Sequence, residues 1–152
     1  MGLRREAREY TLQFLHKFDA AKTLPDRKTI ESELKAFWKS FSPNFYKEGK
    51  EFSERLIWSV FDHRERIDSF IEGCLKNWKI GRLAAIDRNI IRIAIAEFLY
   101  FDDIDFNVTI NEAIEISKKY GMEKSPQFIN GVLDRLKGIV EKEEGIKKQC
   151  QM

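Results

Sequence analysis

One stretch near the middle of the chain, Ile90 to Phe101, is apolar at almost every position. Only Arg92 and Glu97 interrupt it, so a helix formed there would be hydrophobic on most of its circumference. The stretch is far shorter than the ~20 residues that a helix needs to cross a bilayer, and we expect no membrane association. It therefore predicts a buried helix at the centre of a globular domain.

The rest of the chain repeats apolar residues at helical spacing on both sides of this stretch. Helices are predicted over about residues 4–22, 30–41, 43–62, 62–78, 109–120 and 125–143, with a break at 79–82 before the central helix. Asp62 with Glu65, and Thr109 with Glu112, have the spacing of capping boxes at two helix starts. Gly121 is expected to end a helix in the left-handed conformation.

The composition supports an all-α fold. The chain has three prolines and eight glycines, too few for many short strands joined by turns. Its 152 residues fit one domain, which we expect to cover residues 1–152. The two cysteines, Cys74 and Cys150, give no disulfide framework, which is typical of a protein in the reducing cytoplasm.

Charge is unevenly distributed along the chain, although the net charge is only +2. Residues 76–92 carry five Lys or Arg against one acidic residue, whereas residues 97–115 carry six acidic residues and no basic one. This pattern predicts a surface with one basic side and one acidic side.

The sequence offers little for catalysis or for binding a cofactor or a metal ion. Its two histidines, His16 and His63, have no Cys, His or carboxylate partner at metal-binding spacing. It contains no Gly-rich phosphate loop and no nucleophile elbow. We therefore expect no catalytic residues, no cofactor and no metal.

Two clusters suggest contact with nucleic acid. Arg4, Arg5 and Arg8 lie together at the positive end of the first helix, where phosphate is attracted, although surface arginines also simply keep a terminus soluble. The second cluster surrounds Phe128, with Lys118, Lys119, Lys124 and Gln127 close by in the sequence. An exposed aromatic ring beside basic residues can stack on an unpaired nucleobase. Helical spacing alone, however, favours Phe128 as a residue at the rim of the core.

Three segments together resemble the NusB family of bacterial transcription antitermination factors. They are RREARE at residues 4–9, DRNIIRIA at 87–94, and VTINEAIE at 108–115 followed by KKYG at 118–121 and FINGVLD at 128–134. The resemblance implies a non-catalytic domain of about seven helices in two small bundles, divided near residues 79–82. It also implies binding of boxA RNA in nascent ribosomal transcripts, with the ribosomal protein NusE as partner, within an antitermination complex on RNA polymerase.

The resemblance assigns roles to particular residues. Arg4, Arg5 and Arg8 match the family's RNA-contacting helix start, and Phe128 matches its RNA-stacking aromatic; we add Lys118, Lys124 and Gln127 to the RNA surface by chemistry and position. His16 and Asp87 fall on the face that is similar to the family's partner surface. Two positions depart from the pattern: His16 stands where the family often has tyrosine, and Lys124 where relatives can be acidic.

Two other functions are compatible with a helical domain of this kind. A similar domain precedes the catalytic domain of some ribosomal RNA cytosine methyltransferases, but this chain contains no βαβ segment that could bind their cofactor. Alternatively, the domain could bind only proteins, with Arg4, Arg5 and Arg8 paired to acidic neighbours.

Overall fold

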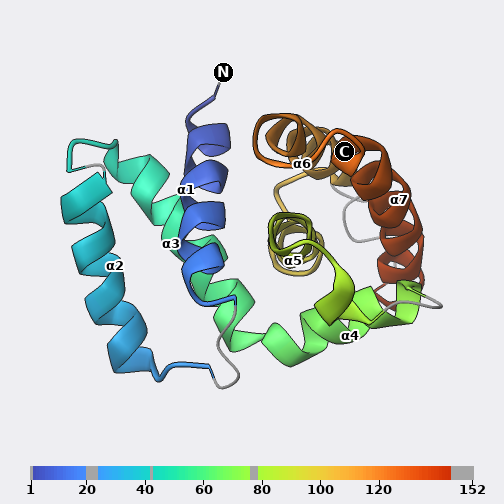
Figure 1. The fold of residues 1–152 in the computed structure, drawn as a ribbon, viewed down its shortest axis with the longest axis horizontal. Helices are drawn as coiled ribbons and strands as arrows, with labels where there is room; N and C mark the ends of the chain where they lie inside the picture. Colours follow the sequence, from blue (N-terminus) through green and yellow to red (C-terminus); the bar gives the residue numbers. More distant parts are fainter. Residues whose placement is uncertain (1, 20–23, 42, 76–78, 145–152) are drawn as a thin grey trace.

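The computed structural model describes residues 2–19, 24–41, 43–75 and 79–144. Within these residues the chain forms seven α-helices, one short 3₁₀ helix and no strand, which confirms the all-α prediction (Figure 1). The helices are α1 (Leu3–Lys17), α2 (Arg27–Phe41), α3 (Lys47–Asp62), α4 (Arg64–Cys74), η1 (Ile80–Arg82), α5 (Ala85–Tyr100), α6 (Phe106–Tyr120) and α7 (Ser125–Glu144).

Helix α5 is the centre of the fold, as its apolar sequence predicts. It contacts α1, α3, α4, α6 and α7, and every residue from Asn89 to Leu99 is buried. Figure 1 shows α5 end-on in the middle of the molecule, with the neighbouring helices around it. In the described part of the chain no helix is long and apolar enough to cross a membrane.

Helix α2 is held at the edge of the molecule by aromatic side chains. Tyr10 of α1 meets Trp38 of α2 with ring centroids 5.6 Å apart, and it meets Phe45, in the turn before α3, at 4.9 Å. Phe14 and Phe37 make a further edge-on contact at 5.4 Å. Such ring pairs add roughly 0.5–1.5 kcal/mol each beyond the buried area, which compensates for the small backbone contact of α2.

The break predicted at residues 79–82 is present as η1 between α4 and α5. Helix α4 packs on α3, and also on α5 and α7. A division of the chain into two bundles near this break stays a prediction, because α5 contacts helices that precede it and helices that follow it.

Two predicted capping boxes are wrong. Helix α6 begins at Phe106, and Asp105 caps it by accepting a hydrogen bond from the Asn107 N–H at 2.8 Å, because this aspartate reaches the free amides before Thr109 can. Helix α4 begins after His63 without a side-chain cap, and the Asp62 carboxylate instead accepts a hydrogen bond from Arg27. The ends of two predicted helices, residues 20–22 and 76–78, lie outside the described residues, as does Ser42, which precedes the predicted helix 43–62.

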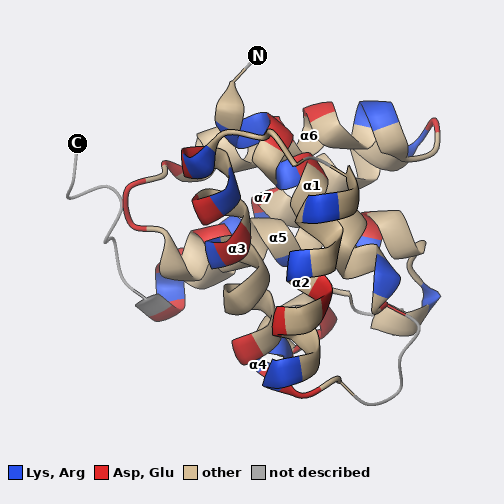
Figure 2. Ribbon diagram, turned by 90° about the vertical axis from the view of Figure 1, so that its left-hand side faces the viewer, with Lys and Arg blue, Asp and Glu red and all other residues tan. Residues whose placement is uncertain are grey.

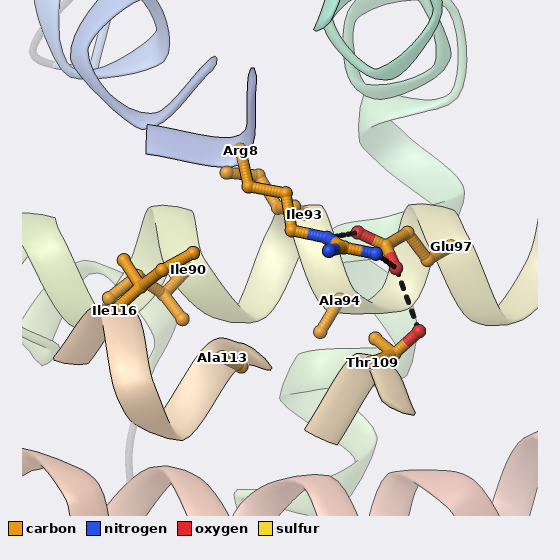
Figure 3. Close-up of a pocket in the computed structure, with 8 residues that line it drawn as sticks. All are labelled: Arg8, Ile90, Ile93, Ala94, Glu97, Thr109, Ala113 and Ile116. Atoms are coloured by element: carbon orange, nitrogen blue, oxygen red, sulfur yellow. Dashed lines mark hydrogen bonds and ion pairs between the residues drawn. The ribbon is translucent and has the colours of Figure 1, made fainter. Parts of the chain in front are cut away.

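A buried ion pair connects α1, α5 and α6 (Figure 3). Arg8 donates to both carboxylate oxygens of Glu97, with Nε–Oε2 at 2.6 Å and Nη2–Oε1 at 2.9 Å. The Thr109 hydroxyl donates to the same carboxylate at 2.7 Å, which is why Thr109 is buried inside α6 and does not cap it. This arrangement fixes both α1 and α6 against the central helix.

A second polar network holds the chain that follows α1. The Asp19 carboxylate accepts hydrogen bonds from Arg88 at 2.9 Å, Asn89 at 3.0 Å and Arg92 at 3.2 Å, and Arg92 also donates to Asp68 of α4. Burial raises the pKa of Asp19, but the hydrogen bonds and charges of these partners hold it below its usual value. The network therefore joins the segment after α1 to α4 and α5 through charged side chains.

Gly121 makes the turn between α6 and α7 possible, although not in the predicted left-handed conformation. Its φ is −90°, which any residue can adopt. The constraint is space, because a Cβ added here would lie 2.7 Å from Oγ of Ser125 and 2.8 Å from the carbonyl oxygen of Ser117. The close approach of Ser125, whose hydroxyl accepts from the Met122 N–H at 2.9 Å, starts α7 directly after the turn.

We expect Arg8→Ala to destabilise the fold by about 3–5 kcal/mol, because it leaves the Glu97 charge buried without its main partner. Arg4→Ala is the matched control, since Arg4 lies on the same helix and pairs with Asp103, but with half of its side chain exposed. It should cost less than about 1 kcal/mol. Urea unfolding followed by circular dichroism measures both, and equal losses would contradict the structural role of Arg8.

Gly121→Ala should lower stability by about 1–3 kcal/mol, because the new methyl group overlaps Ser125 and the backbone of α6. Gly131→Ala, inside α7 with open space around it, should raise stability by roughly 0.5–1 kcal/mol. Melting temperatures of the two variants should therefore move in opposite directions. A shift of the same sign would show that the turn has room to relax.

Candidate nucleic-acid interface

The three arginines of the α1 start lie at different depths. The Arg4 side chain is 51% exposed and pairs with Asp103 at 3.3 Å, whereas Arg5 is partly buried and donates to Glu112 at 2.6 Å. Arg8 is only 4% exposed and is engaged by Glu97. Arg4 and Arg5 therefore reach the surface, while the Arg8 guanidinium is directed into the protein.

The predicted separation of charge into a basic side and an acidic side is wrong. Three acidic residues of the segment 97–115, Glu97, Asp103 and Glu112, pair with the arginines of α1. Figure 2 accordingly shows blue and red side by side on α1 and its surroundings. Sequence order concealed this, because the ion pairs join residues about one hundred positions apart.

Helix α6 connects the two clusters that the sequence singled out. Arg5 of α1 pairs with Glu112, and Glu9, one turn further, accepts from Lys119 and from the Tyr120 hydroxyl at 2.8 Å each. The start of α1 therefore meets the middle of α6, and the next turn of α1 meets the end of α6. With 1.5 Å per residue, about 10 Å of α6 separates Glu112, where Arg5 is bound, from Lys119.

The lysines of this surface differ in their partners. Lys118 pairs with Glu115 on the same helix at 3.3 Å, and Lys119 pairs with Glu9, whose hydrogen bond and charge raise the Lys119 pKa. Both ammonium groups remain largely exposed. Lys124 has no ion pair with any residue that the structure describes, so its charge is available to a ligand.

A groove of about 400 Å³ lies where the starts of α5 and α7 come together. It is lined by residues of η1 and the α5 start and by residues of the α6–α7 turn and the α7 start: Arg82, Leu83, Ala84, Asp87, Met122, Lys124, Ser125 and Phe128. Phe128 is half-buried, so one part of the ring packs on the core while the ring also lines the groove. Gln127 is exposed on the same turn of α7.

This groove unites residues that the sequence analysis assigned to different surfaces. Asp87 was expected to contact a protein partner, and Lys124 and Phe128 were expected to contact RNA, yet all three line one groove. Sequence reasoning missed Arg82 and Met122 as lining residues. Arg82 belongs to the basic segment 76–92 and Met122 follows the helix-ending glycine, but neither feature indicates a shared surface.

His16 lies elsewhere. It is exposed on α1 and lines a second groove of about 380 Å³ between α1 and α2, together with Gln13, Lys17, Ala36, Phe37, Ser40 and Phe41. Phe41 is 65% exposed, so this groove presents a large apolar side chain to solvent. His16 and Asp87 therefore do not share a groove.

The chain is similar over nearly its whole length to known antitermination proteins. The transcription antitermination protein NusB of Geobacter sulfurreducens is 44% identical over 140 residues, which cover 90% of this chain and 94% of that protein. The corresponding protein of Trichlorobacter lovleyi is 42% identical over 146 residues, covering 95% and 96%.

Solved structures share the fold. NusB from T. maritima matches with a TM-score of 0.77 and 34% identity, covering 89% of this chain and 90% of that one. A chain in the crystal structure of antitermination factors NusB and NusE in complex with double-stranded RNA matches with a TM-score of 0.77 and 25% identity, covering 91% and 98%.

The NusB family model matches residues 5–137, which include the arginines at the α1 start from Arg5, the whole of α6 and the groove at Phe128. The helices, their order and the sequence relatives agree, and the chain belongs to the NusB family of transcription antitermination proteins.

Proposed function

We propose that this protein binds boxA RNA of nascent ribosomal transcripts together with NusE, as a non-catalytic adaptor of an antitermination complex on RNA polymerase. The observation that carries the proposal is the groove that Phe128 lines together with Lys124, which has no ion pair to any described residue. The solved relative in complex with NusE and RNA supports both partners.

The RNA is proposed to run along α6 from the arginine end to this groove. Arg4 and Arg5 at one end, and Lys118 and Lys124 at the other, would contact phosphates, with Gln127 donating to the backbone or a base. Phe128 would stack on a base, which requires an unpaired base because stacked duplex bases present no free face. Arg8 would act as a positioning residue, since its ion pair with Glu97 holds the helix that presents Arg4 and Arg5.

The NusE surface is proposed to include His16. Its groove between α1 and α2 exposes Phe41 and therefore offers apolar area that a protein partner could cover. Asp87, the second residue expected on the partner surface, lines the Phe128 groove instead. A domain that binds only proteins would use the His16 groove in the same way but would leave the α6 surface without RNA.

Fluorescence anisotropy with a short boxA RNA and a scrambled RNA, each with and without NusE, tests the proposal. We expect boxA to bind more tightly, NusE to increase that preference, and affinity to fall with salt as phosphate contacts are lost. Equal binding of both RNAs without any effect of NusE would overturn the proposal. Absence of RNA binding with intact NusE binding would indicate a domain that binds only proteins.

Two variants should separate stacking from charge. Phe128→Leu keeps apolar bulk on the core but removes the ring, and should weaken RNA binding by about 1–3 kcal/mol at every salt concentration. Lys124→Gln should reduce the slope of log affinity against log salt by about 0.7, because one phosphate contact is lost. Lys35→Gln, on an exposed position of α2, is the control and should change neither quantity. Identical salt slopes for all four proteins would remove Lys124 from the RNA surface.

A further inference from the structure

Asp87 is a buried carboxylate with an unused acceptor. Asp87 is among the residues that line the Phe128 groove and is only 8% exposed, and its Oδ1 has no hydrogen-bond partner in the described part of the chain. A buried polar atom without a partner costs about 1–3 kcal/mol, and more when the group is charged. A carboxylate kept in this position is therefore suited to a donor supplied by a ligand.

The neighbouring side chains do not satisfy this carboxylate. Asp87 lies in the first turn of α5, but no side chain caps that helix, whose N-cap is Ala84. The adjacent Arg88 turns away, donating to Asp19 and to the carbonyl oxygens of Ile80 and Leu83.

The other walls of the groove indicate the chemistry of the ligand. The Phe128 ring provides a flat apolar surface, and Lys124 and Arg82 provide two cations without ion pairs among the described residues. A ligand that satisfies all three features is flat, carries N–H donors on its edge and bears a negative charge. An unpaired nucleotide has this combination.

We infer that the groove is a base-reading pocket in which Asp87 accepts a hydrogen bond from the amino group of a nucleobase stacked on Phe128. The inference rests on the proposed RNA-binding function. Cytosine, adenine and guanine carry an exocyclic amino group, whereas uracil presents a carbonyl oxygen at the position of the cytosine amino group, which the carboxylate repels. Asp87 would therefore select a base with an amino group and reject uracil.

A protein partner is the less favourable occupant. A lysine or arginine of that partner could satisfy Asp87, but it would enter a groove already lined by Lys124 and Arg82. A nucleotide instead brings a phosphate for these cations along with the donor for the carboxylate. The charges of the groove thus favour RNA.

The test measures the affinities of labelled cytidine and uridine hexanucleotides by anisotropy. A hydrogen bond to a charged group contributes about 1.5–3 kcal/mol, so the wild-type protein should prefer the cytidine hexamer by about tenfold or more. Asp87→Asn should bring the ratio of the two affinities close to one, because an amide can donate to uracil as well as accept from cytosine. Lys124→Gln is the control and should weaken both hexamers without changing their ratio.

A second measurement needs no variant and therefore does not depend on folding of Asp87→Asn. A hexamer of 2-pyrimidinone ribonucleotides, which are cytidines without the amino group, should bind the wild-type protein as weakly as the uridine hexamer. Equal affinities for cytidine and 2-pyrimidinone hexamers would overturn the inference. An Asp87→Asn variant with unchanged melting temperature that still prefers cytidine would also overturn it. The inference would fail as well if this variant lost NusE binding but kept its RNA binding unchanged. If boxA RNA itself fails to bind, the proposed function fails rather than the base preference alone.

Discussion

The buried ion pair between Arg8 and Glu97 is the interaction on which the other features of this structure depend. Removing two charges from water is costly, and the cost is offset only by good geometry and by hydrogen bonds to the remaining lone pairs. Both conditions hold, because Arg8 donates twice and Thr109 supplies a further donor. Because the three residues come from α1, α5 and α6, the pair sets the position of both outer helices on the core helix, and with them the surface proposed to bind RNA.

Arginines that are neighbours in the sequence have different roles because their side chains are buried to different extents. Arg4, Arg5 and Arg8 share one helix start, yet one is half-exposed, one is partly buried and one is enclosed. Their guanidinium groups pair with three of the six acidic residues in the segment 97–115. Arg8 thus holds the helix in place, whereas Arg4 and Arg5 are presented at its end, on the surface proposed to bind RNA.

The groove at the starts of α5 and α7 combines features that only tertiary contact brings together. Gly121 permits a tight turn that places Ser125 and Phe128 beside residues 82–87. The resulting groove has an aromatic wall, two cations and one carboxylate with an unused acceptor, which is the basis for proposing both RNA binding and base selection there. His16 lies on the separate groove between α1 and α2, so the surfaces proposed for NusE and for RNA are distinct.

The sequence by itself determined the helical class, the central helix, the break before it and the family, because apolar periodicity and contiguous motifs are local properties of the chain. It also identified Phe128, Lys124 and the arginines as chemically suited to RNA. It misplaced the caps at Thr109 and Asp62, because several residues compete locally for the same free amides and tertiary partners decide among them. Only the tertiary structure showed that Arg8 is buried, that acidic residues of the segment 97–115 pair with the arginines of α1, and that Asp87 and Phe128 line one groove. Burial and pairing depend on helices that are distant in the sequence, and no local pattern records which of them will meet.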